Sequence, residues 1–389
     1  MRSGGRPEGT LQGPDASQTR RSRSLRERIG SWFDRNAGNV FLLPTFLIVL
    51  LLSIFPFLVS AYLSLSRIRF VRGGFEITFV GLRNYRKLIK GSEKRHFLGV
   101  FGDFSLISWL ILIVFVALLG YALWRYLRSG HRISAAGVIY RIITFSILSY
   151  GMWYLLKTLS SGGRPGTLAV TFIYVFLGIG CQYLLGLGLA LLTTQRLVGR
   201  RFFRVVFLLP MMITPVGIAY TFRMLTDTDK GPINPIWKLL GLAEVSWVTS
   251  PWGARWAIMI GDIWQWTPFM FIVLLAAIEG LPEELFEAAH VDGASRWQIF
   301  WNITLPQLVP VSVTVVLIRM IEAFKIVDLP NVLTNGGPGT ATESLTLHSF
   351  FTWRALDLGG SAAIAYMLLI VSLFVGISYA NLLQQRAQR

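Results

Sequence analysis

The chain has 389 residues, of which 53% are hydrophobic and only 15% are charged. A water-soluble domain carries about 25% charged residues, so this composition excludes an ordinary soluble fold and indicates that lipid is part of the solvent. The formal net charge of +17 does not indicate a nucleic-acid partner, because the basic residues flank the apolar runs instead of forming one patch.

Residues 1–38 are polar and rich in Gly, Ser and Arg, a composition that predicts a disordered basic tail. The apolar run behind this tail is too long, and begins too far from the start, to be the core of a cleaved signal peptide. We therefore expect it to remain in the protein as the first membrane-spanning helix.

Apolar runs of the length that a bilayer requires, about 20 residues per helix, recur along the chain. They predict an all-α, polytopic membrane fold with about eight spanning helices. The predicted spans are 40–63, 104–127, 135–159, 168–192, 203–225, 254–278, 309–327 and 361–383. The third is the weakest, since Arg141 and Lys157 would have to extend toward the two interfaces.

Basic residues in the short loops predict the orientation, because such residues collect on the cytoplasmic side of a membrane. The tail, Arg128 with Arg132, the cluster 196–204 and the carboxyl end all fall on one side of the eight spans. We therefore expect both termini in the cytoplasm. Segment 67–95 does not follow this rule, since it is rich in Lys and Arg and yet this order of spans places it outside. We keep the orientation, because moving this one loop to the cytoplasm would place every other basic loop outside.

Two outer segments carry local patterns. Residues 75–80 alternate as a short strand does, and 82–89 have helical spacing. Between the fifth and sixth spans, Gly-Pro and Asn-Pro pairs indicate turns, and 236–242 form an amphipathic piece able to lie at the interface. We expect these segments to form an external collar.

Enzymatic motifs are absent from the sequence. The single cysteine, Cys181, excludes a disulfide framework, and no Gly-x-x-x-x-Gly-Lys-Ser/Thr phosphate loop occurs, so the chain is not expected to hold ATP. The four histidines, His96, His131, His290 and His348, fall in different loops, which argues against a catalytic cluster. We expect no catalytic residue, no cofactor and no metal site.

The most diagnostic pattern lies in the loop 280–306, between the sixth and seventh spans. Pro282 and the acidic residues behind it indicate a helix start, and Gly293 would end that helix. We expect 295–303 to form a second short helix, and Pro306 to begin the seventh span. Small alanines allow close approach, so the two helices would make a compact plug for a groove on another protein. An ordinary amphipathic loop is the alternative.

The motif in this loop reads Glu287-Ala288-Ala289, then Asp292-Gly293, then Ile303-Thr304-Leu305-Pro306. It resembles the coupling loop of bacterial binding-protein-dependent ABC importer permeases of the carbohydrate-uptake class. Residues 199–204, 208–215, 264–269 and 332–339 are similar to the maltose, glycerol-phosphate and trehalose type of first permease subunit. The resemblance covers 39–97 and 166–385 and implies a six-helix core, from which the hairpin 104–159 departs.

The resemblance implies a permease subunit of an ATP-driven importer for a sugar or an oligosaccharide in the bacterial inner membrane. The implied partners are a second permease subunit in a heterodimer, an ATP-binding cassette ATPase dimer, an extracytoplasmic substrate-binding protein and membrane lipid. The residues implied to couple ATP hydrolysis in the ATPase to movement of the permease are Glu287, Ala288, Ala289, Asp292 and Gly293. The implied domains are the cytoplasmic tail 1–38, a first helix and external segment at 39–103, the extra hairpin at 104–159 and the permease core at 160–385.

A substrate path is expected between the sixth and seventh spans. Arg319, Glu322 and Lys325 recur at three-residue steps, so Glu322 could pair with either neighbour. Aromatic rings beside a few polar groups suit a sugar, and the resemblance implies contacts from both spans. The expected path residues are Gln265, Trp266, Phe269, Arg319, Glu322, Ala323 and Ile326. A structural ion pair between helices and lipid-facing aromatic rings are the alternatives.

Gly336, Gly337 and Pro338 cannot continue a helix and indicate an external turn. The resemblance implies that this turn docks the substrate-binding protein; a simple connector is the alternative.

A sugar phosphate or a polyol is the alternative cargo. The competing classes are an ATP-independent secondary transporter, which should show repeated halves that this sequence lacks, and a membrane enzyme.

Overall fold

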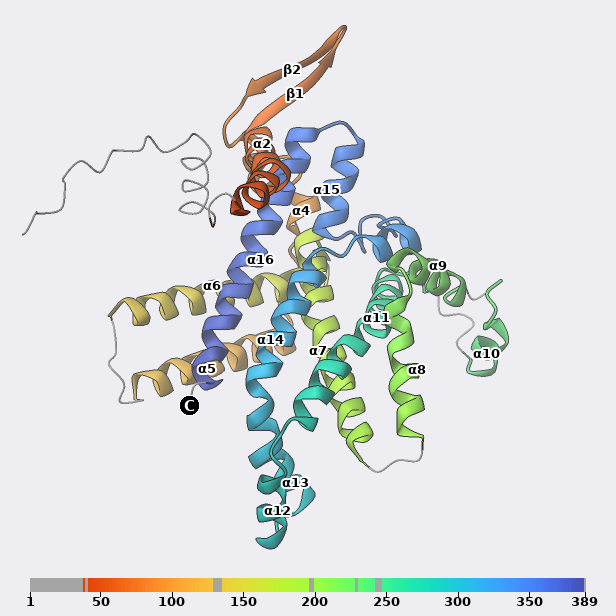
Figure 1. The fold of residues 1–389 in the computed structure, drawn as a ribbon. Helices are drawn as coiled ribbons and strands as arrows, with labels where there is room; N and C mark the ends of the chain where they lie inside the picture. Colours follow the sequence, from red (N-terminus) through yellow and green to blue (C-terminus); the bar gives the residue numbers. More distant parts are fainter. Residues whose placement is uncertain are drawn as a thin grey trace, which may run out of the picture. The chain divides into compact units, whose positions relative to one another are not determined.

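The computed structural model describes residues 38, 41–128, 135–195, 199–227, 230–241 and 247–387, and their side chains except at 135, 136 and 382–387 (Figure 1). The predicted tail 1–38 lies outside these residues apart from Gly38, and so do Arg132 and Arg196 of the basic loops. By its internal contacts the chain divides into two units, Met1–Val59 and Ser60–Arg389. The side-chain contacts given below lie within the second unit.

Within the described residues, seven helices are long and apolar enough to cross a membrane, which confirms the all-α polytopic fold. The first, Phe41–Ser64, includes a π-helical turn, η1 (Leu50–Ile54), and ends with α2 (Phe55–Ser64). The others are α5 (Leu106–Leu127), α6 (Ala135–Leu159), α7 (Thr167–Thr194), α11 (Pro251–Glu279), the run Arg296–Phe324 and α16 (Leu358–Ala387). The length of the apolar runs in the sequence predicts these spans well. In lipid the backbone N–H and C=O groups must be hydrogen-bonded within the helix itself, so each span is one long helix of apolar residues.

The fifth predicted span, 203–225, is two helices, α8 (Arg200–Met212) and α9 (Pro215–Leu225), bent by 97°. Thr214 has an extended backbone, with ψ of 145°, and its hydroxyl accepts a hydrogen bond from the Gly217 amide at 3.3 Å, which caps a new helix. Pro215 then occupies the first turn, where a missing N–H is tolerated. Counted as one broken span, the pair gives the predicted total of eight.

The seventh span begins earlier than expected. α13 (Arg296–Ile299), a π-helical turn η2 (Phe300–Thr304) and α14 (Leu305–Phe324) form one helical run. The prediction of a separate short helix ending before Pro306 is therefore wrong. A proline lacks an N–H and crowds the carbonyl four residues back, and the π turn immediately before Pro306 accommodates both effects without ending the helix.

The segment after α2 consists of a strand hairpin and two short helices. β1 (Ser66–Val71) pairs antiparallel with β2 (Gly74–Phe79), with Ser66 opposite Phe79, which confirms the strand expected at 75–80. α3 (Arg83–Lys90) confirms the helix expected at 82–89, and α4 (Lys94–Phe97) follows it. The buried residues Leu88 and Phe97 pack against α16 and the unpredicted helix α15 (Leu345–Arg354). A further short helix, α10 (Asn234–Leu239), covers part of the amphipathic piece expected at 236–242.

The extra hairpin, α5 and α6, is closed at its base by a strand clasp. β3 (Gly99–Val100) pairs antiparallel with β4 (Arg164–Pro165), and Asp103 bridges to Ser161. The Gly102 amide donates to the Lys157 carbonyl at 2.8 Å, and a Cβ on Gly102 would lie 2.4 Å from the Ser161 carbonyl oxygen. Only glycine permits this approach. The chain therefore leaves the helical core before α5 and returns to it after α6 at one place.

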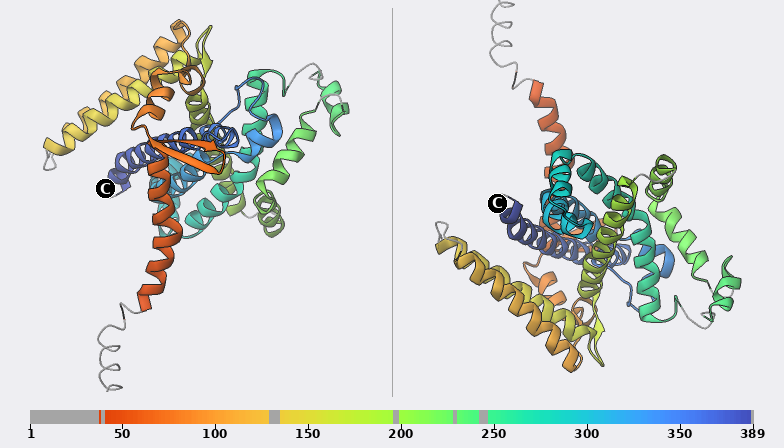
Figure 2. Two further views of the ribbon diagram at one scale, coloured as in Figure 1. Left: turned by 90° about the horizontal axis from the view of Figure 1, so that it is seen from above. Right: turned by 90° about the horizontal axis from the view of Figure 1, so that it is seen from below.

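The core of the larger unit forms where α7, α11, α14 and α16 meet (Figure 2). Gly186 of α7 lies against Met270 of α11, where an added Cβ would come within 2.5 Å of the Met270 Cβ. One buried cluster combines Val175 from α7, Met270, Val315 from α14 and Val375 from α16. Close packing of these helices fixes the relative positions of the polar groups that they carry.

Candidate functional site

The loop between α11 and α14 contains the first of the two expected short helices, α12, and a corner that leads into α13, the start of the run Arg296–Phe324; α12 and α13 together are called the plug below. α12 (Glu283–Val291) begins after Pro282, and its first turn carries Glu283 and Glu284 at the positive end of the helix dipole. Gly293, at φ +73°, ends the helix: the Ala294 amide donates to the Ala289 carbonyl at 2.9 Å, and the Gly293 amide to the His290 carbonyl at 3.1 Å. This is a Schellman closure, which needs a left-handed residue where Gly293 stands.

A capping box starts the next helix at once. The Ser295 amide donates to Gln298 Oε1 at 2.8 Å, and the Gln298 amide donates to the Ser295 hydroxyl at 3.4 Å. Only four residues, 292–295, therefore lie between α12 and α13, which makes the corner short and well defined. Figure 1 shows α12 and α13 beyond the adjoining ends of α11 and α14.

Four of the five expected coupling residues are exposed on this plug, namely Glu287, Ala288, Asp292 and Gly293, whereas Ala289 is buried. Apolar side chains are exposed beside them: Val291 is 88% exposed and Trp297 68%. Exposed apolar groups gathered on a protruding element are typical of a protein–protein contact. The plug therefore exposes both a carboxylate and apolar surface.

The ends of three helices are tied together by Arg204, which belongs to the predicted motif 199–204. Its guanidinium pairs with Glu279 at the end of α11 and also donates to the Thr193 carbonyl of α7 at 3.4 Å. Glu279 was not expected to take part. Because α12 follows α11 after only a few residues, this ion pair fixes the base from which the plug extends.

A buried polar network joins the three core helices. Arg319 of α14, which is 1% exposed, donates to Gln182 Oε1 of α7 at 2.9 Å and to Asp262 Oδ2 of α11 at 2.5 Å. Gln182 in turn donates to the same Asp262 oxygen at 2.8 Å. A buried charge is tolerated when it is paired and fully hydrogen-bonded. Gln182 was missed, although a lone glutamine inside an apolar span is a costly residue that signals such a partner.

The expected path residues fall into two groups. The Arg319 guanidinium carbon lies 4.6 Å from the centroid of the Trp266 ring, and Trp266 meets Phe269 edge to face at 6.2 Å. Glu322 instead pairs with Lys325 at 2.7 Å. Arg319, the remaining residue of the row at three-residue steps, pairs with Asp262 on another helix. Gln265 and Ala323 are buried and Ile326 is half-buried. Oε1 of Gln265 has no hydrogen-bond partner among the described residues.

The turn 335–342 is held by hydrogen bonds from its own residues and from the core. The Thr342 hydroxyl donates to the Gly337 carbonyl at 2.8 Å, and Arg255 of α11 donates to the Ala341 carbonyl at 2.7 Å. Gly336, at φ +81°, is buried, whereas Gly337 and Pro338 are half-buried. The turn follows the π-helical η3 (Pro330–Thr334), so it is a defined surface and not part of a helix, as expected.

Two of the four histidines meet, against the prediction that they lie apart. The rings of His96 on α4 and His348 on α15 have centroids 4.0 Å apart. Burial, with the nearby charges of His96 and Lys87, lowers the pKa of His348 to about 3. Burial alone would lower the pKa of His96, but the hydrogen bond and charge of Glu343, with the charge of Glu93, raise it above its usual value.

Comparison with known proteins agrees with this arrangement. The model of the binding-protein-dependent transport system inner membrane component family matches residues 182–388. The trehalose/maltose transport system permease protein MalF of Thermococcus litoralis is 36% identical over 59% of this chain and 78% of its own length. The sulfoquinovosyl glycerol transport system permease protein SmoG of Agrobacterium fabrum is 33% identical over 52% of this chain and 66% of its own.

A similar fold occurs in a solved structure of a bacterial ABC transporter involved in the import of the acidic polysaccharide alginate. The matched chain superimposes with a TM-score of 0.59 at 18% identity, over 92% of this chain and 99% of its own length. This likeness concerns the fold alone. It extends over most of the residues described above.

Proposed function

Since the chain belongs to the family of binding-protein-dependent transport system inner membrane components, it is a multi-pass membrane permease, and we propose that its cargo is a sugar or an oligosaccharide. Support comes from the relatives whose names specify trehalose, maltose and sulfoquinovosyl glycerol. The aromatic pair Trp266 and Phe269, beside buried polar groups, is the kind of surface on which the C–H face of a sugar stacks. A sugar phosphate or a polyol is the alternative cargo.

The exposed plug carries the proposal of ATP-driven import. It interrupts the chain between α11 and α14, the two helices that share the ion pair of Asp262 and Arg319. A movement imposed on α12 by a partner would therefore reach both walls of the path. We assign Glu287, Ala288, Asp292 and Gly293 to direct contact with an ATPase subunit, and Ala289 to packing within the plug.

The remaining partners follow from surfaces of the larger unit. An apolar groove of about 550 Å³ lies between α14 and α16, lined in part by Leu317, Ile321, Leu369 and Leu373. Apolar surface of this kind suits a second permease subunit, which would complete a path that one chain cannot enclose. The turn with Gly336, Gly337 and Pro338 is assigned to an extracytoplasmic binding protein, because it is exposed at Gly339 and yet rigidly held.

In the pathway proposed here, Arg319 positions other groups and does not touch the sugar. It is 1% exposed, and all of its described contacts go to Gln182, Asp262 and the ring of Trp266. Its charge holds Trp266 in place by a cation–π contact. Trp266, Phe269 and Gln265 are the residues assigned to the cargo, with Ala323 and Ile326 on the facing helix. Glu322, paired with Lys325, contributes polarity at the margin of the path.

The domain organisation proposed from the sequence remains six core helices with an inserted hairpin. The strand clasp supports this, because Asp103 before α5 and Ser161 after α6 are bridged beside the paired strands β3 and β4. Both termini and the plug are assigned to the cytoplasm on the basis of the basic loops.

Chain sidedness can be tested with one cysteine. We expect Val291→Cys, in a chain whose Cys181 is replaced by serine, to react with an impermeant thiol reagent only after the membrane is opened. Val291 is 88% exposed on the plug, so access from the proper side is not limiting. The same result is expected for a chain lacking 104–159, since removing two spans leaves the order of sides unchanged. Labelling of intact cells in either chain would contradict the topology.

The purified chain alone is expected to hydrolyse no ATP, because it contains no phosphate-binding loop. Hydrolysis should appear when a separate nucleotide-binding subunit is added and should rise with the loaded binding protein. Uptake into vesicles that contain a hydrolysis-dead ATPase distinguishes an ATP-driven importer, which should take up no cargo, from a secondary transporter, which should. Persistent uptake in that experiment would exclude an ATP-driven importer.

A further inference from the structure

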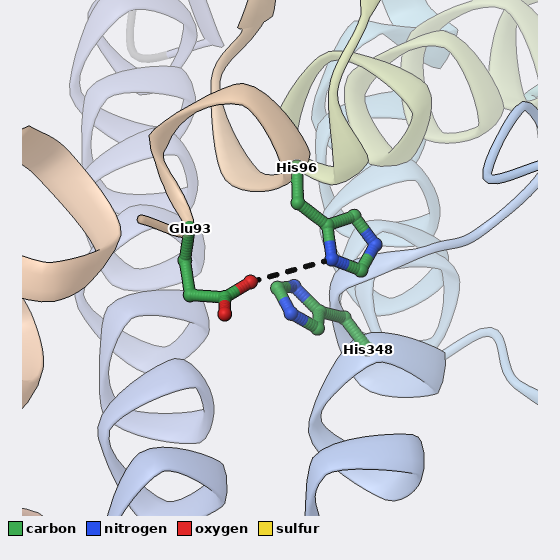
Figure 3. Close-up of side chains that lie close together, drawn as sticks. All are labelled: Glu93, His96 and His348. Carbon is green, nitrogen blue, oxygen red and sulfur yellow. Dashed lines mark ion pairs between the residues drawn. The ribbon is translucent and has the colours of Figure 1, made fainter. Parts of the chain in front are cut away.

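Four ionisable side chains gather where α4 and α15 meet, and the proposed import function uses none of them. Glu93 is the residue immediately before α4, His96 lies within α4, Glu343 precedes α15, and His348 lies within it. Figure 3 shows Glu93, His96 and His348 turned toward one another. Glu93 Oε2 is 3.6 Å from His96 Nδ1, and one ligand atom from each of these three residues lies within 4.8 Å of the other two.

Each imidazole also has a second partner that leaves one nitrogen available. Glu343 Oε2 lies 3.0 Å from His96 Nε2, and since a carboxylate only accepts, Nε2 carries the hydrogen. In the neutral ring the lone pair is then on Nδ1, which faces Glu93. His348 Nδ1 lies 3.3 Å from the buried hydroxyl of Thr167. Histidines that bind a metal almost always use their other nitrogen in this way, to a carboxylate or another polar group.

The two carboxylates of this cluster, Glu93 and Glu343, would be stabilised by a bound cation. Glu343 is 3% exposed, and its Oε1 is buried with no hydrogen-bond partner among the described residues. A carboxylate oxygen buried in this way is costly. Lys87 approaches Glu93 Oε1 only at 3.8 Å and is shared with Asp357. The buried ring of His348 lies directly against His96 and adds a neutral donor to the cluster.

We propose that Glu93, His96 and His348 bind one divalent transition-metal ion, of which Zn²⁺ is the representative, with Glu343 as the carboxylate behind His96. Two imidazole nitrogens and one carboxylate oxygen favour such an ion over Mg²⁺ or Ca²⁺, which prefer oxygen ligands. Ligand atoms of a tetrahedral Zn²⁺ site lie about 3.3 Å apart, so the longest of the present separations needs to shorten by up to about 1.5 Å. The side chains of Glu93 and His96 are 32% and 28% exposed, which provides the entry path.

The bound ion would join segments that are far apart in the chain. Glu93 and His96 come just before the strand clasp, whereas His348 follows the turn that is assigned to the binding protein. Metal binding would therefore fix α4 against α15 and stiffen the outer surface of the permease. This inference does not depend on the identity of the cargo.

The test uses the full chain in detergent, stripped with a chelator and then given ZnCl₂ or MgCl₂. We expect one Zn²⁺ per chain after desalting, a melting temperature that rises with Zn²⁺ and not with Mg²⁺, and visible absorption typical of four-coordinate Co²⁺ when cobalt is used. Glu93→Gln, His96→Gln and His348→Gln should each lose the bound ion. Glu343→Gln should retain it with an affinity about 10- to 100-fold lower, since it leaves all three ligands in place.

The matched control is His290→Gln, which removes a histidine from the plug and should bind Zn²⁺ as the unchanged chain does. Size-exclusion profiles and metal-free melting temperatures identify any variant that fails to fold; partly exposed Glu93 is the substitution least prone to this. A chain that retains no Zn²⁺, or Glu93→Gln and His96→Gln chains that bind it unchanged, would overturn the proposal. ATP-dependent uptake is measured separately, so failure here leaves the import function untouched.

Discussion

Replacing Glu287 by lysine or Gly293 by proline is expected to abolish transport while leaving the chain in the membrane. Glu287 is exposed on α12, so a lysine there reverses the charge offered to the ATPase without disturbing the core. Gly293 has φ of +73°, and a proline fixes φ near −65° and removes the amide that donates to His290. Loss of a central interface contact costs at least about 2 kcal/mol, or roughly a 30-fold loss of coupling.

Two matched variants make this result specific. Glu76→Lys reverses an exposed carboxylate on β2, away from the plug in the chain, and should transport normally. Gly293→Asn should retain most of the activity, because asparagine tolerates a left-handed backbone. ATP-dependent uptake and ATPase stimulation are compared at equal amounts of membrane-inserted protein. Normal uptake by both Glu287→Lys and Gly293→Pro would show that the plug does not couple the ATPase to the path.

Replacing Asp262 by alanine is expected to cause the largest loss of stability, because Arg319 would remain buried without its carboxylate. Removing one partner of a buried ion pair costs about 3–5 kcal/mol, whereas removing both is far less harmful. Asp262→Leu combined with Arg319→Met should therefore be more stable than Asp262→Ala alone. The measurement is thermal unfolding of the purified chain, with membrane abundance as a second readout.

A double-mutant cycle decides whether the two residues act together. Losses in Asp262→Ala and Arg319→Ala that simply add in the double variant would mean that the pair contributes no coupling. Gln182→Leu extends the cycle to the third helix and is expected to cost less, since it removes two hydrogen bonds to the charged pair but leaves the ion pair of Asp262 and Arg319 itself. Glu322→Ala serves as the control, because Glu322 pairs at the surface with Lys325 and exposed pairs contribute little.

Elements whose cause is local could be predicted from the sequence. Apolar length predicted seven spans, alternation predicted β2, and Pro282 with Gly293 predicted both ends of α12. The break in the fifth span has a local cause as well, since Thr214 and Pro215 carry a helix-start pattern. It was missed because the hydrophobic run continues through it, and span length was given more weight than capping.

Contacts between distant segments could not be predicted in the same way. The pattern at Arg319 offered Glu322 as a partner three residues away, but the helices place Asp262 and Gln182 closer to the buried guanidinium. His96 and His348 are brought together by packing of α3, α4, α15 and α16 around Leu88 and Phe97. No spacing rule within one helix or loop contains that information.

The unbroken run Arg296–Phe324 can act as a lever. It has 29 residues, which at 1.5 Å per residue makes it about 43 Å long. A tilt of about 10° at the plug would move the far end by roughly 7 Å on that length. The π turn η2 lies near the plug end of this lever, so a hinge there would leave the 20 residues of α14, about 30 Å, on the side of Arg319. A small displacement of the ATPase surface would thus become a large opening at the outer end of the path.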